Sequence, residues 1–169
     1  MSDEFIYKVQ DTGTVWRYQT QYMTRPSWET YFMDICDKVA TRSTCMRRHV
    51  GAVIVKDNRI LATGYNGAPS GLVHCADIGC YRKENNIPSG TMAEACRASH
   101  AEQNAIVQAA RYGIPIDGST LYCTNFPCSI CTKLIINAGI VCIVYHDDYN
   151  DQLAKELLDE ADIDVIQYD

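Results

Sequence analysis

The sequence predicts an α/β domain with three layers, in which helices cover both faces of a five-stranded mixed sheet. A hairpin of β-branched residues in the first half of the chain is followed by three strand patterns that alternate with helical patterns. Such alternation favours parallel strands joined by right-handed crossovers. The length of 169 residues and the hydrophobic fraction of 47% suffice for one buried core.

The first expected element is a helix that begins after Ser27, a suitable N-cap, and ends near Thr41. Residues 1–22 show no clean period, so we interpret them as an N-terminal extension of a domain that spans residues 23–169. The apolar positions expected to form the buried face of the helix follow helical spacing: Trp28, Tyr31, Phe32, Ile35 and Val39.

A β-hairpin is expected next, because two β-branched runs within residues 50–65 flank a polar turn at residues 57–58. Residues 64–98 are rich in Gly, Pro and polar residues, and a loop of this length in a compact domain usually has a function or is held by something. A helix over residues 99–111 follows and stops at Gly113, a suitable C-cap.

The last third of the chain alternates between strand and helix patterns. Its three strands complete the five-stranded sheet, with parallel pairing expected among them. The expected elements are a strand at 119–124, a helix from Pro127 or Cys128 to before Gly139, a strand at 140–145, a helix at 150–160 and a strand at 163–168.

Composition limits the partners and the compartment. A net charge of −6 offers no surface for wrapping a nucleic acid, although Arg47 and Arg48 could still hold one phosphate group, so a small-molecule partner is expected. No apolar run is long enough to span a membrane and the first ten residues do not resemble a secretory signal, which makes the cytoplasm the expected location. The nine cysteines are then expected to bind metal or to be buried rather than to form disulfides.

Cys128 and Cys131 form a C-x2-C pair that opens a predicted helix directly after a strand and a proline. This spacing lets two thiolates reach one ion, and the N–H groups of the helix terminus stabilise their negative charge. His100, at the start of another helix, is the expected third ligand. Three protein ligands leave tetrahedral zinc one open position for water, as in catalytic sites.

Glu102 lies two residues after His100, whereas neighbouring core positions of a helix are three or four residues apart. We therefore expect Glu102 to act as general base first and general acid afterwards on water activated by the metal. The pattern H-x-E followed by P-C-x-x-C is the signature of zinc-dependent nucleobase deaminases. The simpler alternative is that the two cysteines are buried thiols and His100 is a core histidine.

With the stretches SHAE and FPCSIC in place, the sequence resembles the cytidine deaminase superfamily, and within it the deoxycytidylate (dCMP) deaminases of bacterial and phage type. The resemblance extends from Arg25 to Tyr168. It includes the stretches RSTCMRRHVGAVIVKDNRILATGYNGAPSG, HAEQNAIVQAARYG and LYCTNFPCSICTKLIINAGI. It implies a cytidine deaminase-like fold and the zinc-dependent hydrolysis of dCMP to dUMP and ammonia, which supplies thymidylate synthesis.

The resemblance also implies substrate-binding residues. Arg111 matches an arginine that contacts the 5′-phosphate across a subunit interface, Tyr149 matches a tyrosine at the same phosphate, and Asn66 matches the sugar and phosphate loop. Each residue has a structural alternative. Arg111 could simply favour the helix end, Tyr149 could be one more of eleven tyrosines, and Asn66 could belong to a turn.

Regulation and assembly are expected from the resemblance alone. Relatives of this type are homohexamers that dCTP activates and dTTP inhibits, with Mg²⁺ accompanying the nucleotide. The loop from Gly64 to Gly71, including Asn66 and Gly67, is the expected place for effector phosphates, because its glycines leave backbone amides accessible.

A second, structural zinc is a further expectation from phage relatives, whose first two cysteine ligands align with Cys45 and Cys75. Cys80 and Cys96 are candidates for the other two positions, with His74 as a competitor. Four thiolates would hold the long loop before His100, whereas the alternative is that they are buried thiols. The cysteines expected only to pack in the core are Cys36, Cys123 and Cys142.

Two other functions stay open at this point. One is a deaminase of another nucleoside, base or tRNA substrate in the same superfamily; the net charge disfavours tRNA. The other is a zinc-stabilised binding module without catalysis, which would have no need of Glu102 beside an open coordination position.

Overall fold

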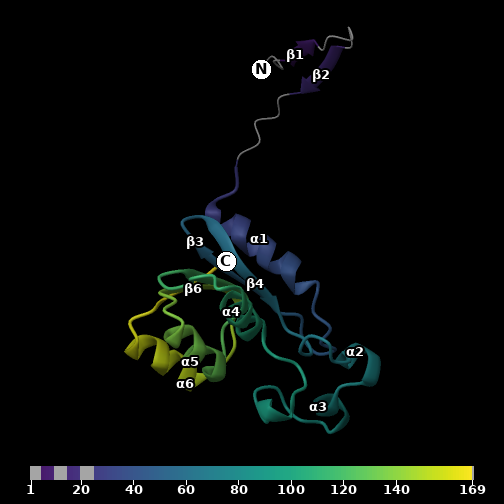
Figure 1. Cartoon of the computed structure of the whole chain (residues 1–169), viewed down its shortest axis with the longest axis vertical. Helices are drawn as coiled ribbons and strands as arrows, with labels where there is room; N and C mark the ends of the chain where they lie inside the picture. Colours follow the sequence, from purple (N-terminus) through teal and green to yellow (C-terminus); the bar gives the residue numbers. More distant parts are fainter. Residues whose placement is uncertain (1–4, 10–14, 20–24, 169) are drawn as a thin grey trace.

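The computed structural model describes residues 5–9, 15–19 and 25–168 of the chain (Figure 1). It confirms the predicted mixed five-stranded sheet, in which β3 pairs antiparallel with β4 and β5, whereas β5, β6 and β7 are parallel. The strand order is β4-β3-β5-β6-β7. The strands are β3 (Gly51–Lys56), β4 (Arg59–Tyr65), β5 (Thr120–Asn125), β6 (Cys142–Asp147) and β7 (Asp164–Gln167).

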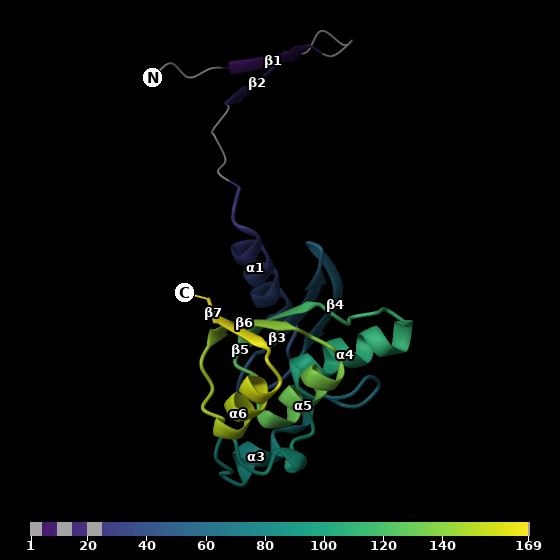
Figure 2. The ribbon, with the colours of Figure 1, turned by 90° about the vertical axis from the view of Figure 1, so that its left-hand side faces the viewer.

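Helices cover both faces of this sheet, as predicted. One face carries α1 (Trp28–Ala40), and the other carries α4 (Ala101–Tyr112), α5 (Ser129–Asn137) and α6 (Gln152–Glu160) (Figure 2). Each face therefore has its own buried cluster. The cluster under α1 contains residues of β3, β5 and β6, and the larger cluster on the opposite face joins the three other helices to the sheet.

The N-terminal part contains a feature that the sequence did not predict. Strands β1 (Phe5–Val9) and β2 (Val15–Gln19) pair antiparallel as a separate two-stranded sheet. The predicted boundary between residues 22 and 23 lies outside the described residues. Within the described ranges, no helix is long and apolar enough to cross a membrane.

Helix α1 begins as predicted, because the Ser27 hydroxyl accepts a hydrogen bond from the Thr30 amide at 3.1 Å. Its predicted buried face is wrong in part, since Trp28 and Tyr31 are 52% and 43% exposed. The helix approaches β3 so closely at Gly51 that a Cβ there would overlap a carbonyl oxygen of α1. This close contact turns a different set of side chains toward the sheet: Phe32, Met33, Cys36 and Ala40.

The predicted hairpin and helix ends are also present. Asp57 and Asn58 have φ angles of 51° and 57°, the left-handed conformation that a two-residue turn between β3 and β4 requires. Gly113 ends α4 with a φ of 65°. The segment expected as a long loop holds the short elements α2 (Cys75–Ile78), α3 (Tyr81–Glu84) and η1 (Ala93–Ala95).

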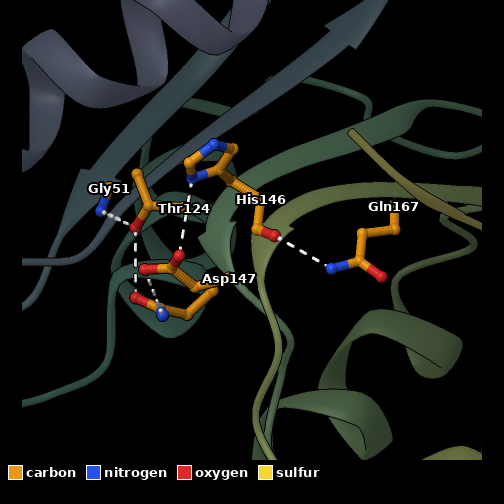
Figure 3. Close-up of polar contacts among 6 residues, drawn as sticks. Gly51, Thr124, His146, Asp147 and Gln167 are labelled. Carbon is orange, nitrogen blue, oxygen red and sulfur yellow. Dashed lines mark hydrogen bonds and ion pairs between the residues drawn. The ribbon is translucent and has the colours of Figure 1, made fainter. Parts of the chain in front are cut away.

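Polar side chains tie the strands together at the end of the sheet near α5 (Figure 3). The Gly51 amide donates to the Thr124 hydroxyl at 3.2 Å, and that hydroxyl donates to the Asn125 side chain at 3.4 Å. The Asn125 amide donates to the Asp147 carboxylate at 3.4 Å. Strand β7 joins through Gln167, whose amide donates to a carbonyl of β6 at 3.3 Å. This network fixes the sheet end from which the chain enters α5.

Candidate metal centre and active site

Two helix N-termini on the same face of the sheet bring the three expected metal ligands together. His100 is the N-cap of α4, Cys128 is the N-cap of α5, and Cys131 lies in the first turn of α5. The His100 Nδ1 atom is 3.4 Å from the Cys128 Sγ and 3.3 Å from the Cys131 Sγ. All three ligand atoms lie within 4.8 Å of one another.

Contacts of α4 with the hairpin determine where His100 lies. The Asn104 side chain donates to the Tyr65 carbonyl at 2.8 Å, which ties α4 to β4. Gly64 lies directly against the helix backbone, since a Cβ at this position would overlap the Ala101 carbonyl oxygen. The His100 amide itself donates to the Gln103 side chain at 2.8 Å, which fixes the first turn.

The two thiols interact strongly with each other and with His100. A hydrogen bond from Cys131, followed by the interaction with His100, lowers the pKa of Cys128 to about 4 although burial opposes the change. The same shared proton, together with burial, raises the pKa of Cys131. A partly buried thiol and a buried thiol side by side repel each other as thiolates, so a metal cation favours the ionisation of both Cys128 and Cys131.

The geometry fits zinc. Zinc–sulfur and zinc–nitrogen bonds of about 2.3 and 2.0 Å at a tetrahedral angle place the nitrogen and sulfur atoms about 3.5 Å apart. The two nitrogen–sulfur distances of 3.4 and 3.3 Å are close to this value. His100, Cys128 and Cys131 thus form a three-ligand set that leaves a fourth position without a protein ligand among the described residues.

Glu102 lies beside this centre with only 4% of its surface exposed. Burial is the main cause that raises the pKa of its carboxyl group, whereas the charge of His100 lowers it. Glu102 lines the same pocket as the three ligands. A buried carboxyl group at this place can accept a proton from a water molecule and return it to a substrate.

The pocket above the metal centre contains two of the three expected substrate-binding residues. Asn66 and Tyr149 line it, whereas Arg111 does not. Arg111 belongs to the last turn of α4, eleven residues after His100, which corresponds to about 16 Å along a helix. In its own chain, Arg111 therefore lies at the far end of the helix from the metal centre.

The side chain of Asn66 is already engaged with the backbone. Its Nδ2 donates to the Arg48 carbonyl at 2.8 Å, and its Oδ1 accepts from the Val50 amide at 2.9 Å. The neighbouring Gly67 pairs with Ser99 through an isolated β-bridge, so this loop is joined to the residue before His100. Asn66 and Gly67 therefore hold the walls of the pocket.

Residues that the sequence analysis did not assign to the pocket also line it. Arg82 comes from α3 in the long loop, and Asn125, Phe126 and Ser129 come from the end of β5 and the start of α5. Asn125, Phe126 and Ser129 lie within three residues of Cys128 in the sequence, and this proximity could have indicated that they line the pocket. Arg82 has no such signal, because only the fold of the loop places it there.

The four cysteines considered for a second metal all line this pocket: Cys45, Cys75, Cys80 and Cys96. Burial, followed by the charges of the other three, raises the pKa of Cys75. Within the described part of the chain, only the first centre has its ligand atoms within 4.8 Å. His74 is exposed, and its Nδ1 lies 3.2 Å from the Thr44 hydroxyl.

The three cysteines expected to pack in the core differ in burial. Cys36 and Cys123 are buried, and Cys142 is partly buried. None of them is among the residues that line the pocket.

Comparisons with known proteins agree with this geometry. The family model described as the cytidine and deoxycytidylate deaminase zinc-binding region matches residues 26–147. The chain is 44% identical over 146 residues to ComE operon protein 2 of Bacillus subtilis, covering 86% of this chain and 73% of that protein. It is 41% identical over 145 residues to the deoxycytidylate deaminase of Schizosaccharomyces pombe, covering 85% of this chain but only 45% of the yeast protein.

A solved structure has the same fold. The dCMP deaminase of cyanophage S-TIM5, in complex with dCMP and dUMP, superimposes with a TM-score of 0.69 at 31% identity. The match covers 86% of this chain and 99% of the phage chain.

Proposed function

The chain belongs to the cytidine and deoxycytidylate deaminase family, and from this premise we propose that it hydrolyses dCMP to dUMP and ammonia and so supplies thymidylate synthesis. The observation that carries the proposal is the convergence of His100, Cys128 and Cys131 beside the buried carboxyl group of Glu102. The named dCMP deaminases among its relatives support dCMP as the substrate.

His100, Cys128 and Cys131 would hold the zinc ion, which supplies Lewis-acid activation of a water molecule when bound. Glu102 accepts a proton from the attacking water and transfers it to the ring nitrogen N3 of cytosine. After the C4–O bond has formed, Glu102 transfers the remaining hydroxyl proton to the amino group, which leaves as ammonia. The pyrimidine keeps the oxygen at C4, so the product is a uracil ring.

The variant Glu102→Gln tests this role because it keeps the size and burial of the side chain but removes the proton acceptor. We expect dUMP formation to fall by about 10²- to 10⁴-fold, while metal analysis still finds zinc. The exposed Glu160→Gln in α6 is the matched control and should retain full activity. Substantial activity of Glu102→Gln would contradict the proposed mechanism.

The proposal also includes a homohexamer, in which Arg111 would contribute to the active site of a neighbouring copy. We place its guanidinium at the substrate phosphate of a neighbouring copy within a hexamer, since it is exposed at the end of α4 remote from its own metal centre. Asn66 and Tyr149 would face the sugar and phosphate from the same chain. Measuring the mass of the protein in solution tests the assembly, and a monomer with full dCMP activity would exclude this role of Arg111.

A second zinc held by Cys45, Cys75, Cys80 and Cys96 is part of the same proposal. Its support is that these four cysteines line the same pocket, with Cys75 and Cys80 buried. Because their sulfur atoms are not as close together as those of the first centre, zinc binding would draw the loop tighter.

Metal analysis distinguishes the two possibilities for these thiols. We expect two zinc ions per wild-type chain and one after Cys75→Ser combined with Cys80→Ser. The control Cys142→Ser removes a partly buried thiol outside the group and should keep two. One zinc ion per wild-type chain would exclude the second site.

Regulation completes the proposal, with dCTP as activator and dTTP with Mg²⁺ as inhibitor at the loop from Gly64 to Gly71. Its support is the resemblance to regulated dCMP deaminases, together with the position of Gly67 beside Ser99 at the entrance to α4. Initial rates over a range of dCMP concentrations, with and without dCTP, test it. A rate curve that neither nucleotide changes would exclude regulation by this pair.

A further inference from the structure

Three arginines of the same chain, Arg47, Arg48 and Arg82, line the pocket above the metal centre and have no role in the chemistry described so far. We propose that Arg48 and Arg82 bind the 5′-phosphate of the nucleotide substrate, and that they set the preference for a nucleotide over a nucleoside. This inference rests on the proposed deaminase function and assigns a substrate-binding subsite to it. The subsite is built within one chain and would add to the contact proposed for Arg111 of a neighbouring copy.

The charge around the pocket favours an anion. The net charge of the whole chain is −6, yet Arg47, Arg48 and Arg82 all line this pocket. Among the described residues, the ion pairs within 4.0 Å are His146–Asp147 and Lys155–Asp148, so neither Arg48 nor Arg82 has a carboxylate partner there. A pocket with unpaired guanidinium groups attracts a phosphate, which accepts their charge-assisted hydrogen bonds.

Acidic groups in the same pocket do not cancel this charge. The Asp151 carboxylate accepts hydrogen bonds from the Ser129 and Ala154 amides at 2.8 and 3.1 Å. It therefore caps the N-termini of α5 and α6. The other acidic residue of the pocket wall is Glu102, the proposed proton carrier at the metal centre. Both carboxylates therefore have other functions in the site.

Arg82 is held in one orientation by its own loop. Its Nη2 donates to the carbonyl oxygens of Pro88 and Thr91, both at 2.7 Å. Its Nε–H is buried and has no hydrogen-bond partner in the described structure. A buried donor without a partner is uncommon in native proteins, and a guanidinium has five donors, so Arg82 keeps donors for a ligand after bracing the loop.

Arg48 is fixed through its backbone by the amide of Asn66, which accepts from Val50 and donates to the Arg48 carbonyl. The Arg48 Cζ atom lies 6.0 Å from the centre of the Tyr149 ring. Asn66 thereby acts as a positioning residue for Arg48. This contact links the loop after β4 to the phosphate subsite.

Tyr149 connects the two arginines. Tyr149 lines the same pocket as Arg48 and Arg82. Burial is the main cause that raises the pKa of its hydroxyl, and the charges of Arg48 and Arg82 both act against this rise. A Cβ at Gly90 would lie 2.9 Å from the Tyr149 hydroxyl oxygen. The phenol therefore packs against the loop that Arg82 braces, and segments distant in sequence form one anion-binding wall.

The test compares dCMP with deoxycytidine, which lacks only the phosphate, on the zinc-loaded full chain. Arg48→Gln and Arg82→Gln should each lower kcat/KM for dCMP by about 10- to 100-fold, because each removes charge-assisted hydrogen bonds. The low rate on deoxycytidine should stay within about twofold of the wild type by the same reasoning. Arg59→Gln, an exposed arginine of β4 outside the pocket, is the matched control.

The outcomes separate this inference from the proposed function. A wild-type chain that does not deaminate dCMP refutes the proposed function, whatever the variants do. An equal loss on both substrates, or an unchanged ratio between them in Arg48→Gln, overturns the phosphate subsite. Should Arg82→Gln lower the melting temperature through its loop contacts, Arg48→Gln decides the matter. A ratio that changes only in Arg111→Gln would assign the phosphate to Arg111 of a neighbouring copy alone and would also overturn the subsite.

Discussion

Gly64 lies where β4 meets α4, and Gly64→Ala is expected to disturb both stability and the metal centre. A Cβ at this position would overlap the carbonyl oxygen of Ala101 and the amide nitrogen of Ala105, and would lie 3.1 Å from the Ala105 Cα. These are backbone atoms of a helix, so no side-chain rotation can make room. Either β4 and α4 separate, or the packing between them stays strained.

The expected magnitude follows from these contacts. Overpacking a core costs about 1–3 kcal/mol, and overlap with rigid backbone atoms places this variant at the upper end. For a chain of this length, about 3 kcal/mol lowers the melting temperature by about 6–12 °C. If α4 moves instead, His100 and Glu102 move with it, and a displacement of about 1 Å in an active site can cost about 10²-fold in rate.

Thermal unfolding of the zinc-loaded protein and kcat/KM for dCMP are the two measurements. The matched control is Gly67→Ala, whose Cβ would lie 3.2 Å from the Thr44 hydroxyl, a side-chain atom that can rotate away. We expect little change in the melting temperature of the control and in its rate without effector, because the contacts of Gly67 with Ser99 are made by the backbone. Wild-type stability and rate in Gly64→Ala would refute this reasoning. A change in the response to dCTP alone would assign Gly64 to the effector site instead.

Three further changes test how the fold supports the site. Ser27→Ala removes the N-cap of α1 and should cost about 1 kcal/mol in unfolding experiments, with full activity retained. Phe32→Ala empties a position that is 1% exposed and should cost about 3–5 kcal/mol in the free energy of unfolding. Burial raises the pKa of Asp151, but hydrogen bonds from Ser129 and Ala154 outweigh it and the net pKa is lowered. Its stabilisation is therefore present at neutral pH and lost as the pH falls through its folded pKa, so Asp151→Asn should flatten the acid side of a plot of stability against pH.

The order and type of the main elements were predictable because their signals are local. β-Branched runs, the two-residue turn and the caps at Ser27 and Gly113 each act within a few residues. The buried face of α1 was predicted in part wrongly because it depends on a distant contact. The approach of the helix to Gly51 turns Cys36 and Ala40 toward the sheet and leaves Trp28 exposed. Helical spacing alone does not predict that approach.

In the candidate site too, residues with a local sequence signal were predictable, whereas residues placed by the folding of a loop were not. His100, Glu102, Cys128 and Cys131 were predicted because chemistry dictates their spacing at two helix starts. Arg82 was missed because its place depends on how the long loop folds, through bonds to carbonyl groups that every sequence has. The basic pair that includes Arg48 was noted as a phosphate candidate, but its position beside Tyr149 emerges only from the fold.

The metal centre and the proposed phosphate subsite depend on different parts of the fold, so substitutions can alter zinc binding and substrate choice separately. The metal ligands and Glu102 lie on α4 and α5, whose positions depend on contacts with the sheet such as that at Gly64. The proposed phosphate contact of Arg82 depends instead on a loop with few buried apolar groups. Changes at the helix–sheet contacts should therefore alter zinc affinity and turnover together. Changes within residues 81–91 should alter the choice between nucleotide and nucleoside while zinc binding persists, because the loop contributes no ligand to the first metal centre.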